Sequence, residues 1–419
     1  MFKNYIKTAV RSLYKNKGFT AINVLGLALG LATCLLIVFY VVDELSYDRY
    51  NTKHDRIVRV NEDLQLGANN QQYAVAMAPL AKTLIAEYPY VEDAVRLKNA
   101  GGTHVRLGNV NVIENRMAFA DPSLFNVFTL PVVSGDAKTA LAEPNSVVIT
   151  ESTAKKYFNT TDAVGGSILF NDHENFKVTA VIKDMPKQSH FVYDFFLSMA
   201  SLPDSRSTAW LRSEYNTYVL LKDGKDAKKL EASFPAFMEK FSGPEMKAEL
   251  GMSMAQFEKS GSHFKLNLTP LTDIHLKSSR LGELSANSTT EYVYIFSAIA
   301  LFILLIACVN FMNLSTARSS NRAREVGVRK VLGSSRQNLV FQFLAESILV
   351  TFVATVIAMA AAVLLLPLFN QVSGKELVVT IDTLKWLLPS LFVTILVIGK
   401  YGSSARKTRS PGKMARKKL

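Results

Sequence analysis

An uncharged apolar run of 22 residues, from Ala21 to Val42, most constrains what this chain can fold into. About 20 apolar residues in a helix span the hydrocarbon core of a bilayer, whereas the apolar core of a signal peptide is shorter. The residues that follow, 43–48, contain no Ala-x-Ala-like cleavage site. The sequence therefore predicts an uncleaved transmembrane helix over residues 21–42.

Three further apolar runs lie in the last third of the chain, at residues 292–312, 343–369 and 384–398. The last holds only 15 residues, which is short for a membrane span. Counting it, the chain has four spans, and its two ends lie on the same side of the membrane.

The net charge of +13 is unevenly distributed. The excess of lysine and arginine lies in residues 1–20, 313–342 and 399–419, whereas residues 43–291 hold 27 basic and 31 acidic residues. Lysine and arginine accumulate in cytoplasmic loops, so we expect the three basic segments inside and residues 43–291 outside. The basic segments flank apolar runs and form no separate soluble fold, so no nucleic-acid partner is expected.

The resulting expectation is a membrane protein: an α-helical bundle of four transmembrane helices, with a large α+β domain between the first and second. Patterning within that domain predicts strands at 145–150, 167–170, 176–182 and 215–221, and helices at 79–88 and after Thr150, a plausible N-cap. Residues 243–262 resemble a mobile helical insertion, and the methionines there, Met246, Met252 and Met254, are expected to be core fillers rather than metal ligands.

Motifs for catalysis and for metal or cofactor binding are missing from the sequence. No Gly-x-x-x-x-Gly-Lys-Ser/Thr loop occurs, so the chain itself should not hydrolyse ATP. The six histidines show no metal-ligand spacing, and neither His-Glu-x-x-His nor Gly-x-Ser-x-Gly is present. Cys34 and Cys308 lie at different depths in apolar runs and should not pair. We expect no catalytic residue, metal or cofactor.

Gly26 and Gly30 form a Gly-x-x-x-Gly spacing in the first apolar run. Small residues four positions apart share a helix face and allow a neighbouring backbone to approach closely. A helix-packing or subunit interface, and the ordinary abundance of glycine in membrane helices, explain this spacing equally well.

The basic segment after the second run is the most informative. It reads Arg324-Glu325-Val326-Gly327-Val328-Arg329-Lys330-Val331-Leu332-Gly333-Ser334-Ser335-Arg336. A loop that only fixes topology needs neither valines nor a glutamate. An amphipathic basic segment at the inner surface is suited to docking on a cytoplasmic partner or on lipid headgroups.

This segment closely resembles the signature of MacB/FtsX-type (type VII) ABC transporter permeases. Residues 23–32 are similar to the family's first helix, and 147–158 and 181–196 to its periplasmic core domain, so the resemblance covers essentially residues 1–398. It implies an inner-membrane subunit with a cytoplasmic N-terminus and a periplasmic domain. Such a subunit works with a second permease half or as a homodimer, together with two copies of an ATPase subunit.

The resemblance also implies which residues contact the ATPase: Arg324, Glu325, Val326, Gly327, Val328, Arg329, Lys330, Leu332, Gly333 and Arg336. ATP-driven movement would then be transmitted across the membrane to the outer domain. Export, lipoprotein release and antimicrobial resistance all fit this mechanism. A membrane-anchored sensor or ligand-binding protein without an ATPase partner is the alternative.

Two departures from the family pattern carry a further expectation. Similar family members are often about twice as long, with the unit repeated, and residues 400–419 differ from the family's usual C-terminus. The sequence therefore suggests a truncated or frameshifted form of a longer permease.

Overall fold

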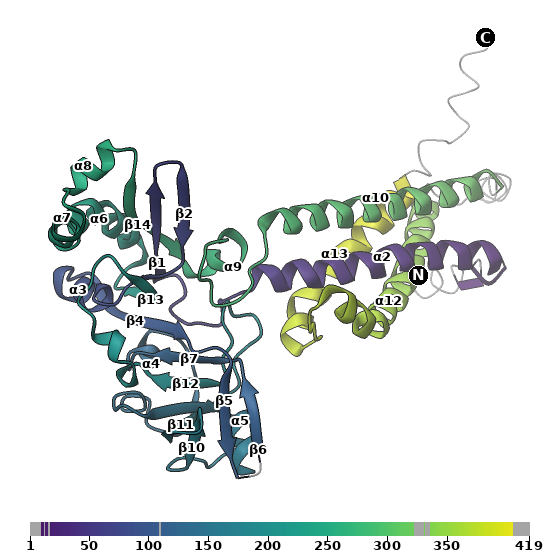
Figure 1. The fold of residues 1–419 in the computed structure, drawn as a ribbon. Helices are drawn as coiled ribbons and strands as arrows, with labels where there is room; N and C mark the ends of the chain where they lie inside the picture. The colour runs from purple at the N-terminus through teal and green to yellow at the C-terminus, as the bar shows by residue number, and fades with distance from the viewer. Residues whose placement is uncertain are drawn as a thin grey trace. The chain divides into compact units, whose positions relative to one another are not determined.

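The computed structural model describes residues 10–11, 13–15, 17–108, 110–321, 331 and 336–404 (Figure 1). The chain divides into two compact units. One comprises residues 1–43 and 291–419, and the other residues 44–290. Each unit is described by itself.

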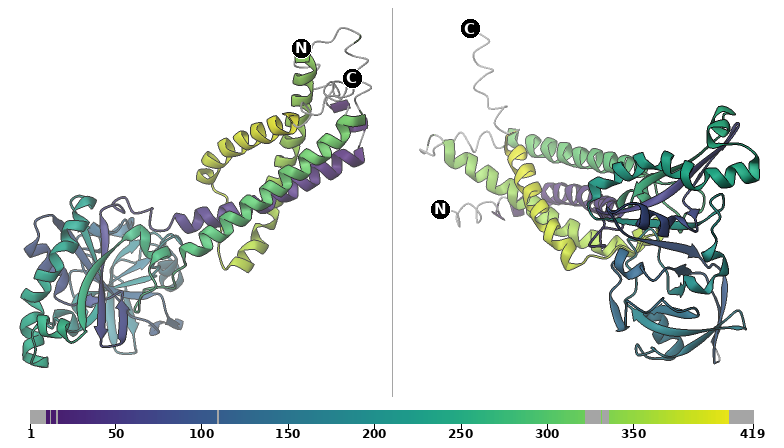
Figure 2. Two further views of the ribbon diagram at one scale, coloured as in Figure 1. Left: turned by 90° about the horizontal axis from the view of Figure 1, so that it is seen from above. Right: turned by 90° about the vertical axis from the view of Figure 1, so that its left-hand side faces the viewer.

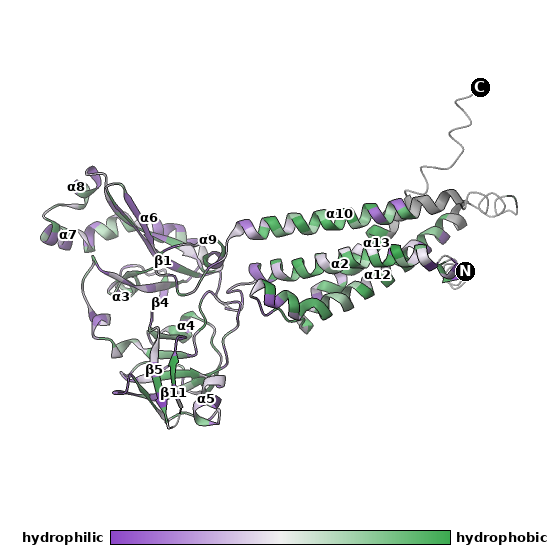
Figure 3. Ribbon diagram, turned by 45° about the vertical axis from the view of Figure 1, so that its right-hand side comes forward, coloured by the Kyte–Doolittle hydropathy of each residue, from purple (hydrophilic) through white to green (hydrophobic). Residues whose placement is uncertain are grey.

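The first unit is built from long helices: α2 (Lys17–Leu45), α10 (Thr290–Asn321), α12 (Arg336–Ser373) and α13 (Ile381–Ser404). Hydrophobic residues dominate all four (Figure 3). Within the described residues, α2, α10 and α12 are long and apolar enough to cross a membrane, whereas the apolar stretch of α13, residues 383–398, is shorter. All four apolar runs are therefore helical, and three candidate spans are found.

The core of this helical unit combines alanines with larger side chains such as leucine and phenylalanine. On α2, Leu27, Ala28, Leu31 and Ala32 are buried, while Leu29, on the opposite side of the helix, is exposed. Both views in Figure 2 show α2 and α10 running side by side. Exposed leucines on an apolar helix are expected where the helix faces lipid, because lipid tails are as apolar as leucine.

The second unit contains a 14-stranded sheet in the order β14-β1-β13-β4-β7-β12-β9-β11-β10-β5-β6, with β2 on β1, β3 on β13 and β8 on β11. Most pairs are antiparallel, but β9 with β11 and β7 with β12 are parallel. The strands are β1 (Ile57–Leu66), β2 (Asn69–Tyr73), β3 (Ala76–Met77), β4 (Val91–Asn99), β5 (Thr103–Leu107), β6 (Val110–Glu114), β7 (Met117–Ala120), β8 (Val132–Gly135), β9 (Ser146–Thr150), β10 (Ser167–Phe170), β11 (Glu174–Ile182), β12 (Phe195–Ser198), β13 (Ser213–Leu221) and β14 (His263–Pro270).

Short helices cover this sheet, which makes the unit an α+β domain, as expected. They are α3 (Leu80–Glu87), α4 (Leu124–Val127), α5 (Glu151–Phe158), α6 (Ala227–Phe241), α7 (Gly243–Leu250), α8 (Met254–Lys259) and α9 (Ile274–Lys277). At one end of the domain α3, α6, α7 and α8 enclose one core; at the other, α5 packs on β9, β10 and β11 (Figure 1).

Local chemistry explains several of these elements. All five residues of β9 are buried, and the Thr150 hydroxyl at its end accepts a hydrogen bond from the backbone of Thr153, which caps α5 as predicted. The predicted insertion is helical, as α7 and α8, and both helices contribute side chains to the domain core. Met246 and Met254 are buried there, which confirms their role as core fillers.

Candidate functional site

The residues predicted to contact an ATPase fall almost entirely outside the described part of the chain. Residues 324–330, 332 and 333 are not described, and Arg336 is the first residue of α12. Their role therefore stays a prediction. The structure does describe the helices on either side of this segment and the places where the domain of residues 44–290 is bonded to its own terminal segments.

The two glycines predicted to pack helices lie where α2 meets α10. A Cβ atom built on Gly30 would stand 2.6 Å from the Cβ of Ala307, and one on Gly26 would stand 3.1 Å from Nδ2 of Asn310. No ordinary side chain fits at the first distance. Both glycines therefore permit a close approach of α2 to α10, which favours the helix-packing interpretation of their spacing.

A column of small and hydroxyl-bearing side chains on α12 faces the interior of the helical unit. Ala354, Ala358 and Ala362 recur every four residues and are almost fully buried. The hydroxyls of Thr351 and Thr355 each donate to the carbonyl four residues earlier, at 2.9 Å. These bonds satisfy the hydroxyls within the helix, so polar side chains are accommodated among apolar ones.

His275 of α9 is bonded to the end of α2 through Glu44, the second-last residue of that helix. Its Nε2 lies 3.0 Å from Oε2 of Glu44, and both side chains are buried. The ring of Tyr47 stacks on the imidazole, with centroids 3.4 Å apart and planes inclined by 3°. A buried carboxylate needs such a partner, because an unpaired buried charge is costly.

The segment that precedes α10 is bonded to the same helix. The backbone N–H of Ser288 donates to the carbonyl of His275 at 2.9 Å, and the Thr290 hydroxyl donates to the carbonyl of Leu276 at 3.0 Å. The four residues of α9 thus hold both terminal segments of the domain. We call α9 with Glu44, Tyr47, Ser288 and Thr290 the α9 anchor.

A second tie begins at Asp48, three residues after the end of α2. Its Oδ1 lies 2.9 Å from Nδ1 of His190, whose Nε2 lies 2.7 Å from the hydroxyl of Tyr218 on β13. All three side chains are buried. Burial raises the pKa of Tyr218 well above its ordinary value, so this hydroxyl stays protonated. Both imidazole nitrogens are occupied, and the group therefore acts as a structural link.

A buried ion pair connects β1 with the chain that leads towards α10. Arg59, fully buried, donates to both carboxylate oxygens of Glu283 at 2.5 and 2.9 Å, and Ser278 bonds to both partners. Burial alone would raise the pKa of Glu283, but the hydrogen bond and charge of Arg59, with the Ser278 bond, hold it below its usual value. A bidentate pair of this kind fixes geometry as well as charge.

Within the described residues, no three His, Cys, Asp or Glu side chains are placed to bind a metal ion. The sequence did not point to either histidine link, because the partners of His275 and His190 lie 231 and 142 residues away along the chain. Neither histidine belongs to a sequence motif with characteristic spacing, so no short stretch of sequence could have identified these two links.

Two family models match the chain. One, described as the MacB-like periplasmic core domain, matches residues 20–237, and the other, described as the FtsX-like permease C-terminal domain, matches residues 297–410. The second match continues past residue 398, where the sequence resemblance was expected to end.

Curated relatives include macrolide export ATP-binding/permease proteins named MacB. Those of Salmonella choleraesuis and Shewanella oneidensis are 21% and 23% identical to this chain, over 84% and 88% of its length and 51% and 54% of theirs. The chain thus spans about half the length of the curated relatives it matches. Among solved structures, a domain of a putative permease protein from Porphyromonas gingivalis matches with a TM-score of 0.46 and 21% identity, over 58% of this chain and 98% of that one.

Proposed function

The chain belongs to the MacB/FtsX family of ABC transporter permeases, and from this premise we propose that it is a non-catalytic permease subunit whose outer domain moves in response to a separate ATPase. In this proposal all four helices span the inner membrane, the N-terminus is cytoplasmic and the domain of residues 44–290 is periplasmic. The basic segment between α10 and α12 contacts the ATPase on the inner side.

The α9 anchor is the observation that carries this proposal. A domain that must follow the movement of two helices needs rigid connections to both of its terminal segments. Glu44 follows the apolar part of α2, Thr290 begins α10, and both are bonded to the four residues of α9. A shift of either segment therefore displaces α9 and the sheet on which it rests, rather than being absorbed by a flexible linker.

Close packing of α2 on α10 supports the same mechanism within the helical unit. At Gly30 and Ala307 the two helices are in such close contact that no space for a further side chain remains between them. They are then expected to move together when the ATPase favours one arrangement over another, and the size of the shift is limited by the difference in binding free energy between the two states.

The assembly proposed for this subunit contains two copies of the ATPase. The permease partner is a second copy of this chain or a second permease half. Export, lipoprotein release and antimicrobial resistance are the classes of activity that such an assembly serves, and the curated relatives are named for macrolide export.

Co-purification with an ATPase subunit from native membranes tests the proposal. The full chain, affinity-tagged and extracted in mild detergent, is expected to retain an ATPase, and the variants Glu325→Lys, Val328→Asp and Arg329→Glu are expected to lose it. Arg11→Glu, a charge reversal in the N-terminal basic segment, is the matched control and should keep it. Recovery of no ATPase with the unaltered chain would instead favour a membrane-anchored sensor.

A further inference from the structure

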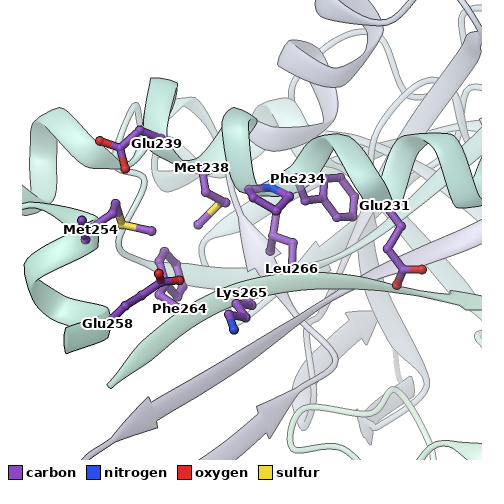
Figure 4. Close-up of a pocket in the computed structure, with 11 residues that line it drawn as sticks. Glu231, Phe234, Met238, Glu239, Met254, Glu258, Phe264, Lys265 and Leu266 are labelled. Atoms are coloured by element: carbon purple, nitrogen blue, oxygen red, sulfur yellow. The ribbon is translucent and has the colours of Figure 1, made fainter. Parts of the chain in front are cut away.

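A cavity of about 430 Å³ opens on the outer domain between α6, α8 and β14 (Figure 4). Its floor is apolar and consists of buried side chains: Phe234 and Met238 from α6, Met254 from α8, and Phe264 and Leu266 from β14. Its volume is within the range of ligand-binding cavities, and its two methionines are flexible side chains that adapt to differently shaped apolar groups.

Beside this cavity runs an edge of the sheet to which no further strand is paired among the described residues. Within the described residues β14 is the terminal strand of the sheet and pairs with β1 alone. The N–H of Leu268 points away from β1, because it donates to Oε1 of Glu231 on α6 at 3.0 Å. Backbone groups alternate between the two sides of a strand, so those of Phe264 and Leu266 also point to the free edge. Such an edge is a template for pairing with another chain.

The rim of the cavity is acidic. Glu231 and Glu239 on α6 and Glu258 on α8 are exposed around the apolar floor. Lys265 also borders the cavity, but side chains alternate along a strand, and Figure 4 shows Lys265 on the opposite side of β14 from Met238. Three carboxylates therefore face a ligand in the cavity, and Glu231 and Glu258 lie towards its two ends.

We propose that this edge binds an extended segment of a partner protein, which adds to the sheet beside β14. One apolar side chain of the segment fills the cavity. The residues two positions before and two positions after this apolar residue share its face of the added strand. Both are lysine or arginine. One pairs with Glu231 at one end of the cavity, and the other pairs with Glu239 and Glu258 at the other end. The intervening residues face the side of Lys265 and carry no positive charge. Main-chain hydrogen bonds give affinity, and the cavity with its rim gives specificity.

Fluorescence anisotropy with the full chain in nanodiscs of zwitterionic lipid tests this proposal; such lipid avoids binding the basic probe itself. The probe is a capped, dye-labelled pentapeptide of arginine, threonine, leucine, threonine and arginine. We expect saturable binding that is weakened about three- to tenfold by the double change Glu239→Gln and Glu258→Gln. Glu249→Gln, on the neighbouring helix α7 outside the cavity, is the matched control and should leave binding unchanged.

Two further measurements separate strand addition from other occupants. N-methylation of the three central residues of the peptide removes backbone donors and should weaken binding about tenfold. Ala255→Trp, at an exposed position on α8 beside the cavity, should abolish binding without disturbing the core. Full affinity of the N-methylated peptide would show that the cavity binds a cationic side chain alone, and stronger competition by a peptide copied from residues 263–270 would point to a second copy of this chain. Either result overturns the proposal.

Discussion

Replacing Gly30 by alanine tests the close approach of α2 to α10. The added Cβ would stand 2.6 Å from the Cβ of Ala307. Two carbon atoms are at their optimal separation at about 3.5–4.0 Å, so the helices must move apart by roughly 1 Å at this point, or the contact must distort. Overpacking of this kind costs about 1–3 kcal/mol.

Gly18→Ala supplies the matched control on the same helix, because among the described residues no heavy atom lies within 4 Å of a Cβ built there. The higher helix propensity of alanine favours Gly30→Ala more than Gly18→Ala, because Gly30 is inside α2 whereas Gly18 is its second residue. The difference between their free energies of unfolding is therefore a lower bound on the steric term of about 1–3 kcal/mol. Ala307→Gly, combined with Gly30→Ala, should recover most of it.

Tryptophan fluorescence reports this change in the helical unit alone. The chain has two tryptophans, and Trp386 on α13 packs edge-on against Phe39 of α2. In a Trp210→Phe background, thermal unfolding followed at Trp386 should show Gly30→Ala several degrees below Gly18→Ala, at about 2–4 °C per kcal/mol. Equal unfolding temperatures for the two variants, or no recovery with Ala307→Gly, would refute the close packing and the rigid helix pair inferred from it.

Two further predictions concern the domain of residues 44–290. Burial, offset in part by a bond from Ser213, raises the pKa of Glu62 to about 7, so the folded domain binds a proton that the unfolded chain releases. Stability should therefore fall as pH rises from about 4.5 to 7, by about 3 kcal/mol in all, and Glu62→Gln should remove this dependence in denaturant titrations at several pH values. His275→Phe keeps a ring against Tyr47 but removes the bond to Glu44. It should cost about 1–3 kcal/mol by the same titration, with His275→Ala costing more.

Features set by short stretches of sequence were predictable. The 22 uncharged residues of the first apolar run can bury their backbone polar groups in lipid only as a helix, and α2 covers them. The strand at Ser146–Thr150 and the helix after Thr150 follow from consecutive β-branched residues and an N-cap. The spacing of Gly26 and Gly30 indicated a close helix contact but could not identify Ala307 as the partner.

Features that depend on distant contacts were not predictable. Residues 227–241 form α6 although Pro235 lies inside it, because Phe234, Phe237 and Met238 are buried against the sheet and outweigh the lost hydrogen bond. The edge position of β14 depends on β1, which lies about 200 residues earlier in the chain. For the same reason the cavity beside β14 has no signature in the sequence.

Because α9 is short, the stability of the α9 anchor depends on contacts outside the helix. A helix of four residues cannot hold itself together in water, since isolated helices shorter than about 12 residues are marginal. Its position therefore depends on the burial of Ile274 and on the bonds that His275 and Leu276 make to the two terminal segments. Weakening one bond loosens the hold on both segments, because they share one small support. A permease subunit whose two segments must move in concert needs this coupling, whereas a domain that only binds a ligand on a tether does not.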